Sequence, residues 1–248
     1  MNVHLIDAGQ GDAILVEAGN ASMLVDCGDS QHADAVVDYL NSSGITALNY
    51  LVATHPHADH IGGCPEVMRA VVVENVLDNG QNASSATYRE FKAAAAGTNY
   101  SAAGKGFQSA LGGAEFSVLW PVEKPLPGTN DNSIVIRLSF GSTAFMLMGD
   151  CERECEENLL NETIAAQVLK VGHHGSGTST SQPFLDKVRP EAAIISVGAN
   201  NTYGHPANAT LSKLAAIGAA VYRTDLNGTI TVSTNGTGYT VAAVGLPN

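Results

Sequence analysis

Short apolar runs, separated by glycine, asparagine and aspartate, dominate the chain. Their length and the turn residues that bound them are typical of β-strands. The pattern predicts strands at 3–6, 13–17, 23–26, 50–53, 71–77, 115–120, 133–140, 144–148, 167–171, 193–197, 220–223, 229–233 and 239–243.

Helical periodicity appears between some of these strands. Positions 33, 36, 37 and 40 share one helical face, with Asp29 or Ser30 as the N-cap and Gly44 as the end. Two further helices are expected, one over 181–188 and one that carries Leu211 and Leu214 and ends at Gly218. Strands that alternate with helices predict a layered α/β architecture. We expect an irregular insertion at 96–113 and a joining loop at 121–132, within one compact domain.

Composition narrows the possible functions. The chain has 248 residues, 44 % of them apolar, which is enough for a sizeable core. Lys and Arg total 12 and Asp and Glu total 24, a net charge of −12. This excludes a protein that holds DNA mainly through basic side chains, although a nucleic acid bound at a metal stays open. No apolar run reaches the about 18 residues of a membrane helix, so we expect no membrane span in this chain.

The four cysteines, Cys27, Cys64, Cys151 and Cys155, match neither a zinc-finger spacing nor a disulfide framework. Cys151 and Cys155 stand four apart on a predicted helix, and we interpret Cys151 as a packing residue. The acidic run 152–157 is interpreted as a solvated face of the same helix.

The strongest chemical signal follows the strand at 50–53. There His55, His57, Asp59 and His60 occur within six residues, before Gly62-Gly63. Imidazole and carboxylate together suit Zn, Mn or Fe(II). A solvated His-rich loop is the alternative, but the spacing after an apolar strand favours a metal site.

Four ligands are too few for two metals, and three later segments offer more. Strands run into Gly149-Asp150, into His173-His174 and into the segment 203–206 that carries His205. Adjacent histidines do not easily point the same way, so one of the pair is expected to bind metal and the other to face substrate. Sites in α/β sheets form at the carboxyl ends of strands, where all these residues lie.

This pattern resembles the metallo-β-lactamase fold superfamily. His55 to His60 match its H-x-H-x-D-H motif, Asp150 its later Gly-Asp and His173-His174 its final histidine motif. Within the superfamily the chain is similar to the hydrolase domain of ComEC-type competence proteins and their stand-alone relatives. The segments that carry this similarity are 7–13, 130–135, 170–176, 196–198 with 203–206, and 223–230.

The resemblance implies an α/β fold, a four-layer αββα sandwich that forms one hydrolase domain over 1–248. It also implies two similar halves, about 1–125 and 126–248. It further implies one or two bound divalent metal ions, with Zn or Mn as the favoured ions. In the family pattern His55 and His57 hold one metal, Asp59, His60 and one of the histidine pair hold the other, and Asp150 bridges. We favour His174 over His173 as the ligand.

One feature departs from the superfamily. A further histidine is usual before the Gly-Asp, and here the segment 127–133 contains none. Asn130, Asp131 or water must therefore complete the coordination of the first metal. A centre that holds only one metal is the alternative. The ComEC-type branch shows the same departure.

We therefore expect a metal-dependent hydrolase, in the first place a phosphodiesterase that generates hydroxide at the metal. Asp59 would orient the water, and His173 and His205 would bind phosphate or protonate the leaving oxygen. Gln10 and Asp12 would support the metal loop. Hydrolysis of a lactam, lactone or thioester is one alternative, and a non-catalytic surface module that retains metal is another.

Partners follow from the resemblance together with the net charge of −12, which fits a small phosphodiester better than long DNA, and location follows from the resemblance. The expected partner is a small-molecule or phosphodiester substrate, with DNA as the family's suggestion, and no protein partner is inferred. Exported stand-alone relatives favour an extracytoplasmic location, and a cytoplasmic one stays open.

Overall fold

Two mixed β-sheets form the centre of the computed structural model, which describes residues 1–243. The first sheet has the order β15-β14-β1-β2-β3-β4-β5-β6 and the second the order β13-β12-β11-β10-β9-β8-β7. The first consists of β1 (Asn2–Leu5), β2 (Ile14–Ala18), β3 (Ala21–Val25), β4 (Ala47–Ala53), β5 (Val72–Asp78), β6 (Asn99–Ala102), β14 (Ile230–Thr234) and β15 (Tyr239–Ala243). The second consists of β7 (Gln108–Leu111), β8 (Ala114–Trp120), β9 (Val135–Phe140), β10 (Thr143–Leu147), β11 (Val168–Lys170), β12 (Ala192–Ile195) and β13 (Ala220–Arg223).

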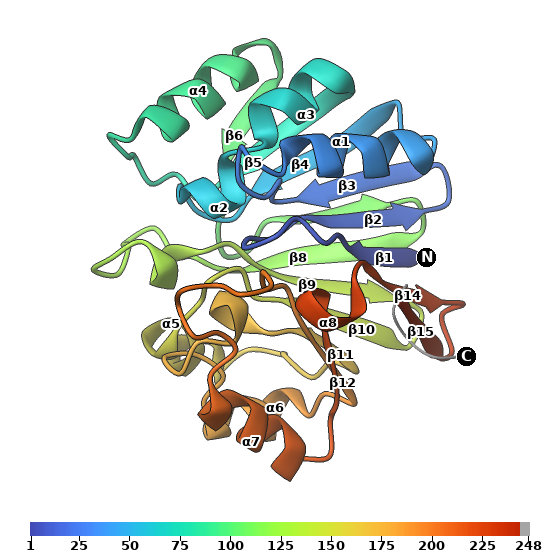
Figure 1. Cartoon of the computed structure of the whole chain (residues 1–248), viewed down its shortest axis with the longest axis vertical. Coiled ribbons are helices and arrows are strands. Elements are labelled where there is room, and N and C mark those ends of the chain that lie inside the picture. Colours follow the sequence, from blue (N-terminus) through green and yellow to red (C-terminus); the bar gives the residue numbers. More distant parts are fainter. Residues whose placement is uncertain (244–248) are drawn as a thin grey trace.

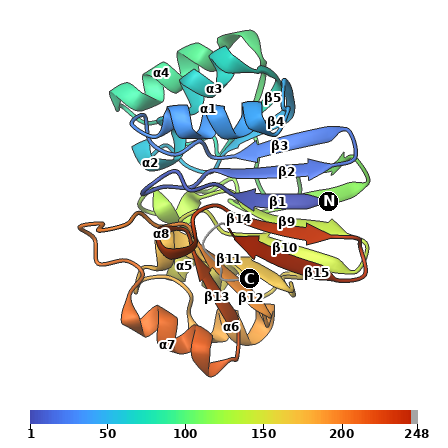
Figure 2. The same cartoon turned by 45° about the vertical axis from the view of Figure 1, so that its right-hand side comes forward.

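Helices cover the outer face of each sheet (Figures 1 and 2). The first sheet carries α1 (Ala33–Ser42), α2 (Ala58–Ile61), α3 (Cys64–Ala70), α4 (Ala86–Ala94) and the short turn η1 (Ala95–Gly97). The second carries α5 (Arg153–Leu159), α6 (Gln182–Val188) and α7 (Asn208–Ala216), and α8 (Thr224–Asn227) follows β13. Two further short turns are η2 (Asn130–Asn132) and η3 (Gly172–Gly175).

Three apolar cores lie between the four layers. Residues such as Ile14, Phe116 and Phe145 fill the space between the sheets. Leu40 belongs to the core under the helices of the first sheet, and Phe184 to the core under those of the second. A sheet that is covered on both faces requires apolar side chains on both, which explains the continuous apolar runs in the sequence. The predicted αββα sandwich is confirmed.

The sheets divide the chain differently from the expected halves at about residue 125. The second sheet already begins with β7, and the last hairpin, β14-β15, returns to the first sheet beside β1. The irregular insertion predicted at 96–113 is wrong, because it contains β6 and β7. Both are four-residue edge strands with mostly exposed or half-exposed side chains, so they lack the apolar alternation that marks a strand.

Two local predictions also need correction. Helix α1 begins after His32, while the Asp29 carboxylate accepts the backbone N–H groups of Gln31 and His32 before the helix, each at 2.9 Å. The acidic run is not wholly solvated, because Glu156 is buried and accepts the backbone N–H groups of Thr180 and Ser181.

The cysteines form two disulfides, Cys27–Cys64 and Cys151–Cys155. The interpretation of Cys151 as a packing residue alone is therefore wrong. The Cys27–Cys64 bond joins the segment that follows β3 to the start of α3. Among residues 1–243, no helix is long and apolar enough to cross a membrane.

Candidate metal centre

The predicted ligands meet at the carboxyl ends of parallel strands from both sheets. His55 to His60 follow β4, and Asp150 follows β10. His174 lies in η3, directly after β11, which pairs in parallel with β10. The two sheets thus bring these loops to one edge of the sandwich.

The tightest group surrounds Asp150 Oδ1. This oxygen lies 3.3 Å from His60 Nε2 and 3.5 Å from His174 Nε2. Asp59 Oδ2 lies 3.4 Å from the same His174 nitrogen and 4.0 Å from His60 Nε2. Asp59, His60 and His174 thus place one ligand atom each within 4.8 Å of one another, close enough to share a metal ion.

The second group shares Asp150. His55 Nε2 lies 3.5 Å from Asp150 Oδ2 and 3.0 Å from His57 Nδ1. His55 is buried, whereas the His57 side chain is exposed at the mouth of the site. His55, His60 and Asp150 also place one ligand atom each within 4.8 Å of one another, and the division of the ligands between two metals stays a prediction.

Unsatisfied buried atoms test whether a metal fits. His60 Nε2, His174 Nε2 and Asp150 Oδ1 face one another, and within residues 1–243 none of them has a hydrogen-bond partner. Buried polar atoms are normally paired, since an unpaired one costs about 1–3 kcal/mol. A divalent cation at their centre would satisfy all three, so the residues fit the metal that the sequence predicts.

The opposite nitrogen of each buried imidazole is held by the protein. His60 Nδ1 donates to Asp26 Oδ2 at 2.8 Å, and His174 Nδ1 donates to the Ser196 carbonyl at 2.9 Å. The Asp26 carboxylate also accepts the backbone N–H and hydroxyl of Thr54, both at 2.7 Å. Such contacts direct the free Nε2 toward a metal. Asp26 was missed from sequence, although its place at the end of an apolar strand, as for Asp150, was a usable signal.

The electrostatics favour the same assignment. Burial, together with the neighbouring His60, holds the pKa of His55 well below its usual value, so this ring is a neutral ligand. Burial would also lower the pKa of His60, but the Asp150 and Asp26 carboxylates outweigh it and raise that pKa well above the usual value. His60 and His174 conversely hold the pKa of Asp150 well below its usual value, against the effect of burial. The raised pKa of His60 thus reflects the same concentration of carboxylates that would attract a cation.

Backbone conformation presents several of these groups. Gly11 has φ +143°, and a Cβ there would lie 2.2 Å from the Asp59 carbonyl oxygen, so only glycine lets the two loops approach. His173 and His174 have φ of 48° and 50°, a left-handed conformation that costs about 1–3 kcal/mol per residue. This turn sends the two rings to different places, as the sequence predicts for adjacent histidines.

An open cavity of about 370 Å³ lies over the ligands. Its lining includes Gln10, Asn130, His173, Tyr203 and His205 as well as ligand residues. His173 Nδ1 donates to Glu152 at 2.7 Å, and its Nε2 lies 3.8 Å from Asp150 Oδ2. A larger cavity of about 760 Å³ borders Asn79 and Pro121, and none of the candidate ligands lines it.

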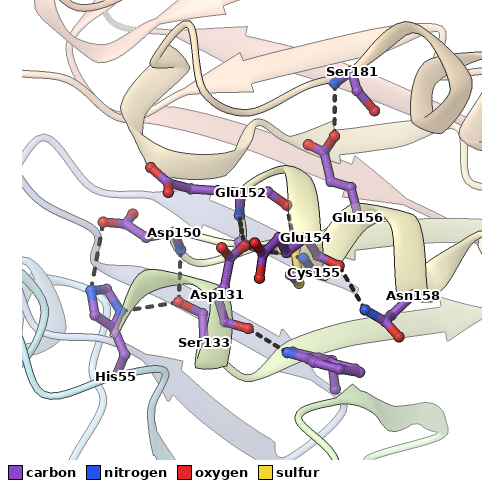
Figure 3. The surroundings of a disulfide bond; sticks show 12 residues. His55, Asp131, Ser133, Asp150, Glu152, Glu154, Cys155, Glu156, Asn158 and Ser181 are labelled. Carbon is purple, nitrogen blue, oxygen red and sulfur yellow. Dashed lines mark hydrogen bonds and ion pairs between the residues drawn. A yellow bond between two sulfur atoms is a disulfide. The ribbon is translucent and has the colours of Figure 1, made fainter. Parts of the chain in front are cut away.

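In the segment 127–133, which lacks the usual histidine, Asn130 and Asp131 point in different directions. Asn130 faces the cavity, with its amide nitrogen 3.5 Å from His173 Nε2, and its buried Oδ1 has no hydrogen-bond partner among the described residues. Asp131 points the other way, into the start of α5, where its carboxylate accepts the backbone N–H groups of Glu152 and Cys155 at 3.0 and 3.1 Å (Figure 3). Asp131 is therefore excluded as the completing ligand, and Asn130 or water remains.

Below the ligands lies a buried ion pair that the sequence did not reveal. Lys170, on β11, has its ammonium group against the Asp12 carboxylate and 3.4 Å from the Gly149 carbonyl oxygen. Asp12 Oδ1 also lies 3.7 Å from His174 Nδ1, and its expected role in supporting the metal loop stays a prediction. Gln10 instead reaches the neighbouring loop, where its side-chain oxygen accepts the Gly198 N–H at 3.0 Å.

The sequence matches the model of the metallo-beta-lactamase superfamily over residues 6–199. The chain belongs to this superfamily. Among solved structures, the metallo-beta-lactamase-fold protein YhfI from Bacillus subtilis covers 90 % of the chain at a TM-score of 0.60 and 12 % identity, with 95 % of its own length matched. Igni18, a metallo hydrolase from Ignicoccus hospitalis, covers 95 % at a TM-score of 0.64 and 19 % identity, with its whole length matched.

The superfamily members most informative about this chain are competence proteins. ComE operon protein 3 of Bacillus subtilis is 34 % identical over 92 % of the chain, and competence protein ComA of Neisseria gonorrhoeae is 33 % identical over 90 %. The chain spans about a third of the length of these relatives, 32 % and 31 %. The predicted similarity to competence proteins is confirmed.

Proposed function

We propose that this protein is a metal-dependent hydrolase and, more specifically, a phosphodiesterase. The observation that supports this most is the orientation of Asp150. Its Oδ2 faces His55 at 3.5 Å, and its Oδ1 faces His60 and His174 at 3.3 and 3.5 Å. One carboxylate that offers an oxygen to each of two ligand groups suits a pair of divalent cations, an arrangement common in enzymes that cleave phosphate esters.

Divalent cations at these residues would polarise a phosphoryl oxygen and lower the pKa of bound water to about 7. His55, His57, Asp59, His60, Asp150 and His174 would hold them. Asn130 would add its amide oxygen if the first cation needs a further ligand. The carboxylate of Asp59, a third of whose surface is exposed at the cavity, would orient the attacking water.

His173 and His205 would contact the substrate. Glu152 accepts the Nδ1 proton of His173, so this ring presents Nε2 to the cavity, next to the Asn130 amide. The Asn130 amide N–H, and Nε2–H of the imidazolium form of His173, would donate to a phosphoryl oxygen. Burial and the neighbouring His173 lower the pKa of His205, so at neutral pH His205 binds as an uncharged N–H donor rather than as a cation.

Turnover and metal content of one preparation test the proposal. Protein loaded with Mn²⁺ or Zn²⁺ is assayed on bis-p-nitrophenyl phosphate, on a dinucleotide and on a β-lactam. We expect hydrolysis of the phosphodiesters, loss of at least a hundredfold in kcat/KM for Asp150→Ala and His57→Ala, and no loss for His32→Ala. His32 is a matched control because it lies outside the cavity and bonds Asp29.

Each alternative predicts a different result. Hydrolysis of the β-lactam but of neither phosphodiester would indicate that the enzyme acts on carbonyl substrates. Metal bound at full occupancy without turnover of any substrate would identify a non-catalytic module.

A further inference from the structure

The loop between β12 and α7 carries an exposed aromatic side chain at the rim of the metal centre. Tyr203 is 69 % exposed and lines the same cavity as His173 and Asp150. The loop extends from the sandwich on the side where α2 lies (Figure 2). A large aromatic group held in solvent at the mouth of a site is available to contact whatever enters it.

Three rings form a row from the ligands outward. The His173 and His205 rings meet edge to face, with centroids 5.5 Å apart. His205 then stacks on Tyr203, with centroids 5.8 Å apart and planes at 21°. One face of the Tyr203 ring is thus directed toward His205, and its high exposure leaves surface for a further planar group to continue the stack.

The loop is fixed from within. Asn201 donates from its amide to the Gly198 and His205 carbonyl oxygens at 3.0 and 2.7 Å, and its own side-chain oxygen accepts the His205 N–H at 3.0 Å. Gln10 holds the Gly198 N–H from the opposite side. Tyr203 is therefore carried by a bonded loop, and a stacking partner gains contact without first ordering the backbone.

The charges around the cavity offer little affinity for the phosphates of a nucleic acid. The ten residues that line the described cavity include no lysine or arginine, and the chain carries a net charge of −12. Ion pairs to flanking phosphates, the usual source of affinity for nucleic acids, are therefore not supplied by this cavity. Stacking on an aromatic ring binds a base without a cation.

We infer that Tyr203 is a specificity-determining residue, a stacking platform for a nucleobase attached to the phosphodiester held at the metal centre. The inference rests on the proposed phosphodiesterase function. The platform would select substrates with a planar group beside the scissile phosphate over aliphatic diesters, and it would do so through binding rather than through chemistry. Tyr203 would contact the base of the substrate and no reacting atom.

Abasic substrates isolate the stacking contribution. The metal-loaded protein is assayed by chromatography on thymidylyl-thymidine and on two analogues, each with one base replaced by hydrogen. Stacking of a base is worth roughly 5- to 150-fold when the aromatic residue is removed. We expect Tyr203→Leu to lower kcat/KM for the dinucleotide within that range, mostly through KM. Tyr203→Phe should retain most of the activity, and Leu226→Ala, an exposed apolar control on α8, should be neutral.

The analogues decide the interpretation. For the analogue that lacks the stacked base, wild type and Tyr203→Leu should agree within about twofold. An equal loss on all three substrates would mean that the variant damages the site, and no loss on any would mean that Tyr203 contributes nothing; both overturn the inference.

Failure of the proposed function is recognised separately. If the wild type cleaves no phosphodiester, that proposal fails, and the platform is tested by calorimetric binding of thymidine 3′,5′-bisphosphate. Weaker binding to Tyr203→Leu by the same factor would support the platform, and equal binding would overturn it.

Discussion

Replacement of Lys170 by methionine tests the electrostatics beneath the metal centre. The Lys170 and Asp12 side chains are both essentially inaccessible to solvent, at 0 % and 1 % exposure. Methionine keeps a similar volume but removes the positive charge, which leaves the Asp12 carboxylate buried opposite an apolar group. Its other oxygen lacks a hydrogen-bond partner among the described residues, and the nearest remaining ring nitrogens, His174 Nδ1 at 3.7 Å and His60 Nδ1 at 4.0 Å, already bond to other groups.

The expected loss is large relative to total stability. Removal of one partner from a buried ion pair costs roughly 3–5 kcal/mol, against roughly 5–15 kcal/mol for unfolding of a whole domain. In a domain of this size, that corresponds to a drop in melting temperature of roughly 6–20 °C. The exposed pair Lys105–Glu162, at 2.6 Å, is a matched control, and Lys105→Met should cost less than about 1 kcal/mol.

Urea unfolding of the metal-free protein, followed by the fluorescence of the single tryptophan, Trp120, measures both variants. The double variant Asp12→Asn/Lys170→Met should recover much of the loss, because it removes the unpaired charge. A loss below about 1 kcal/mol for Lys170→Met, or no recovery in the double variant, would refute the reasoning.

Three further predictions concern metal and disulfides. The raised pKa of His60 favours a protonated ring at neutral pH when no metal is bound, so binding of a metal should release a proton. The apparent metal affinity should therefore rise with pH up to that pKa. Calorimetry in two buffers of different ionisation enthalpy measures the number of protons released. His57→Ala should lower metal content in elemental analysis while His205→Ala leaves it unchanged, and equal losses would place His205 among the ligands. Cys27→Ala/Cys64→Ala opens a loop with a sequence separation of 37 and should lower the free energy of unfolding by about 4 kcal/mol. Cys151→Ala/Cys155→Ala opens a loop with a separation of 4 and should lower it by about 2 kcal/mol. The reverse order in denaturant unfolding would contradict the loop-entropy argument.

Features that depend on a short stretch of sequence, such as buried strands and the histidine motif, could be predicted. The buried strands are continuous apolar runs because helices cover them, and the motif at His55 to His60 concentrates four ligands in one loop. The positions of Asp150 and His174 followed from the rule that sites form where parallel strands end. Edge strands β6 and β7 gave no such signal, because their side chains alternate only weakly between core and solvent.

Contacts between distant segments could not be predicted. Lys170 and Asp12 are 158 residues apart, and neither sequence neighbourhood indicates an ion pair. Four cysteines allow three pairings, and their spacing chooses none of them. Asp131 and Asn130 are adjacent and have side chains of nearly the same shape, yet Asp131 stabilises the start of α5 and Asn130 faces the cavity. Only the turn η2 decides which is which.

The division of the ligands between the two sheets determines when a metal is acquired. His55 and His60 arrive with β4, whereas Asp150 and His174 arrive with β10 and β11. An unfolded chain does not hold these groups together, so the centre closes only after both sheets have packed. Divalent metals compete for such ligands mainly by availability and intrinsic affinity order. The metal taken up at folding therefore reflects the ion supply of the compartment in which the chain folds, and an assay has to replace it with a defined ion before activities are compared.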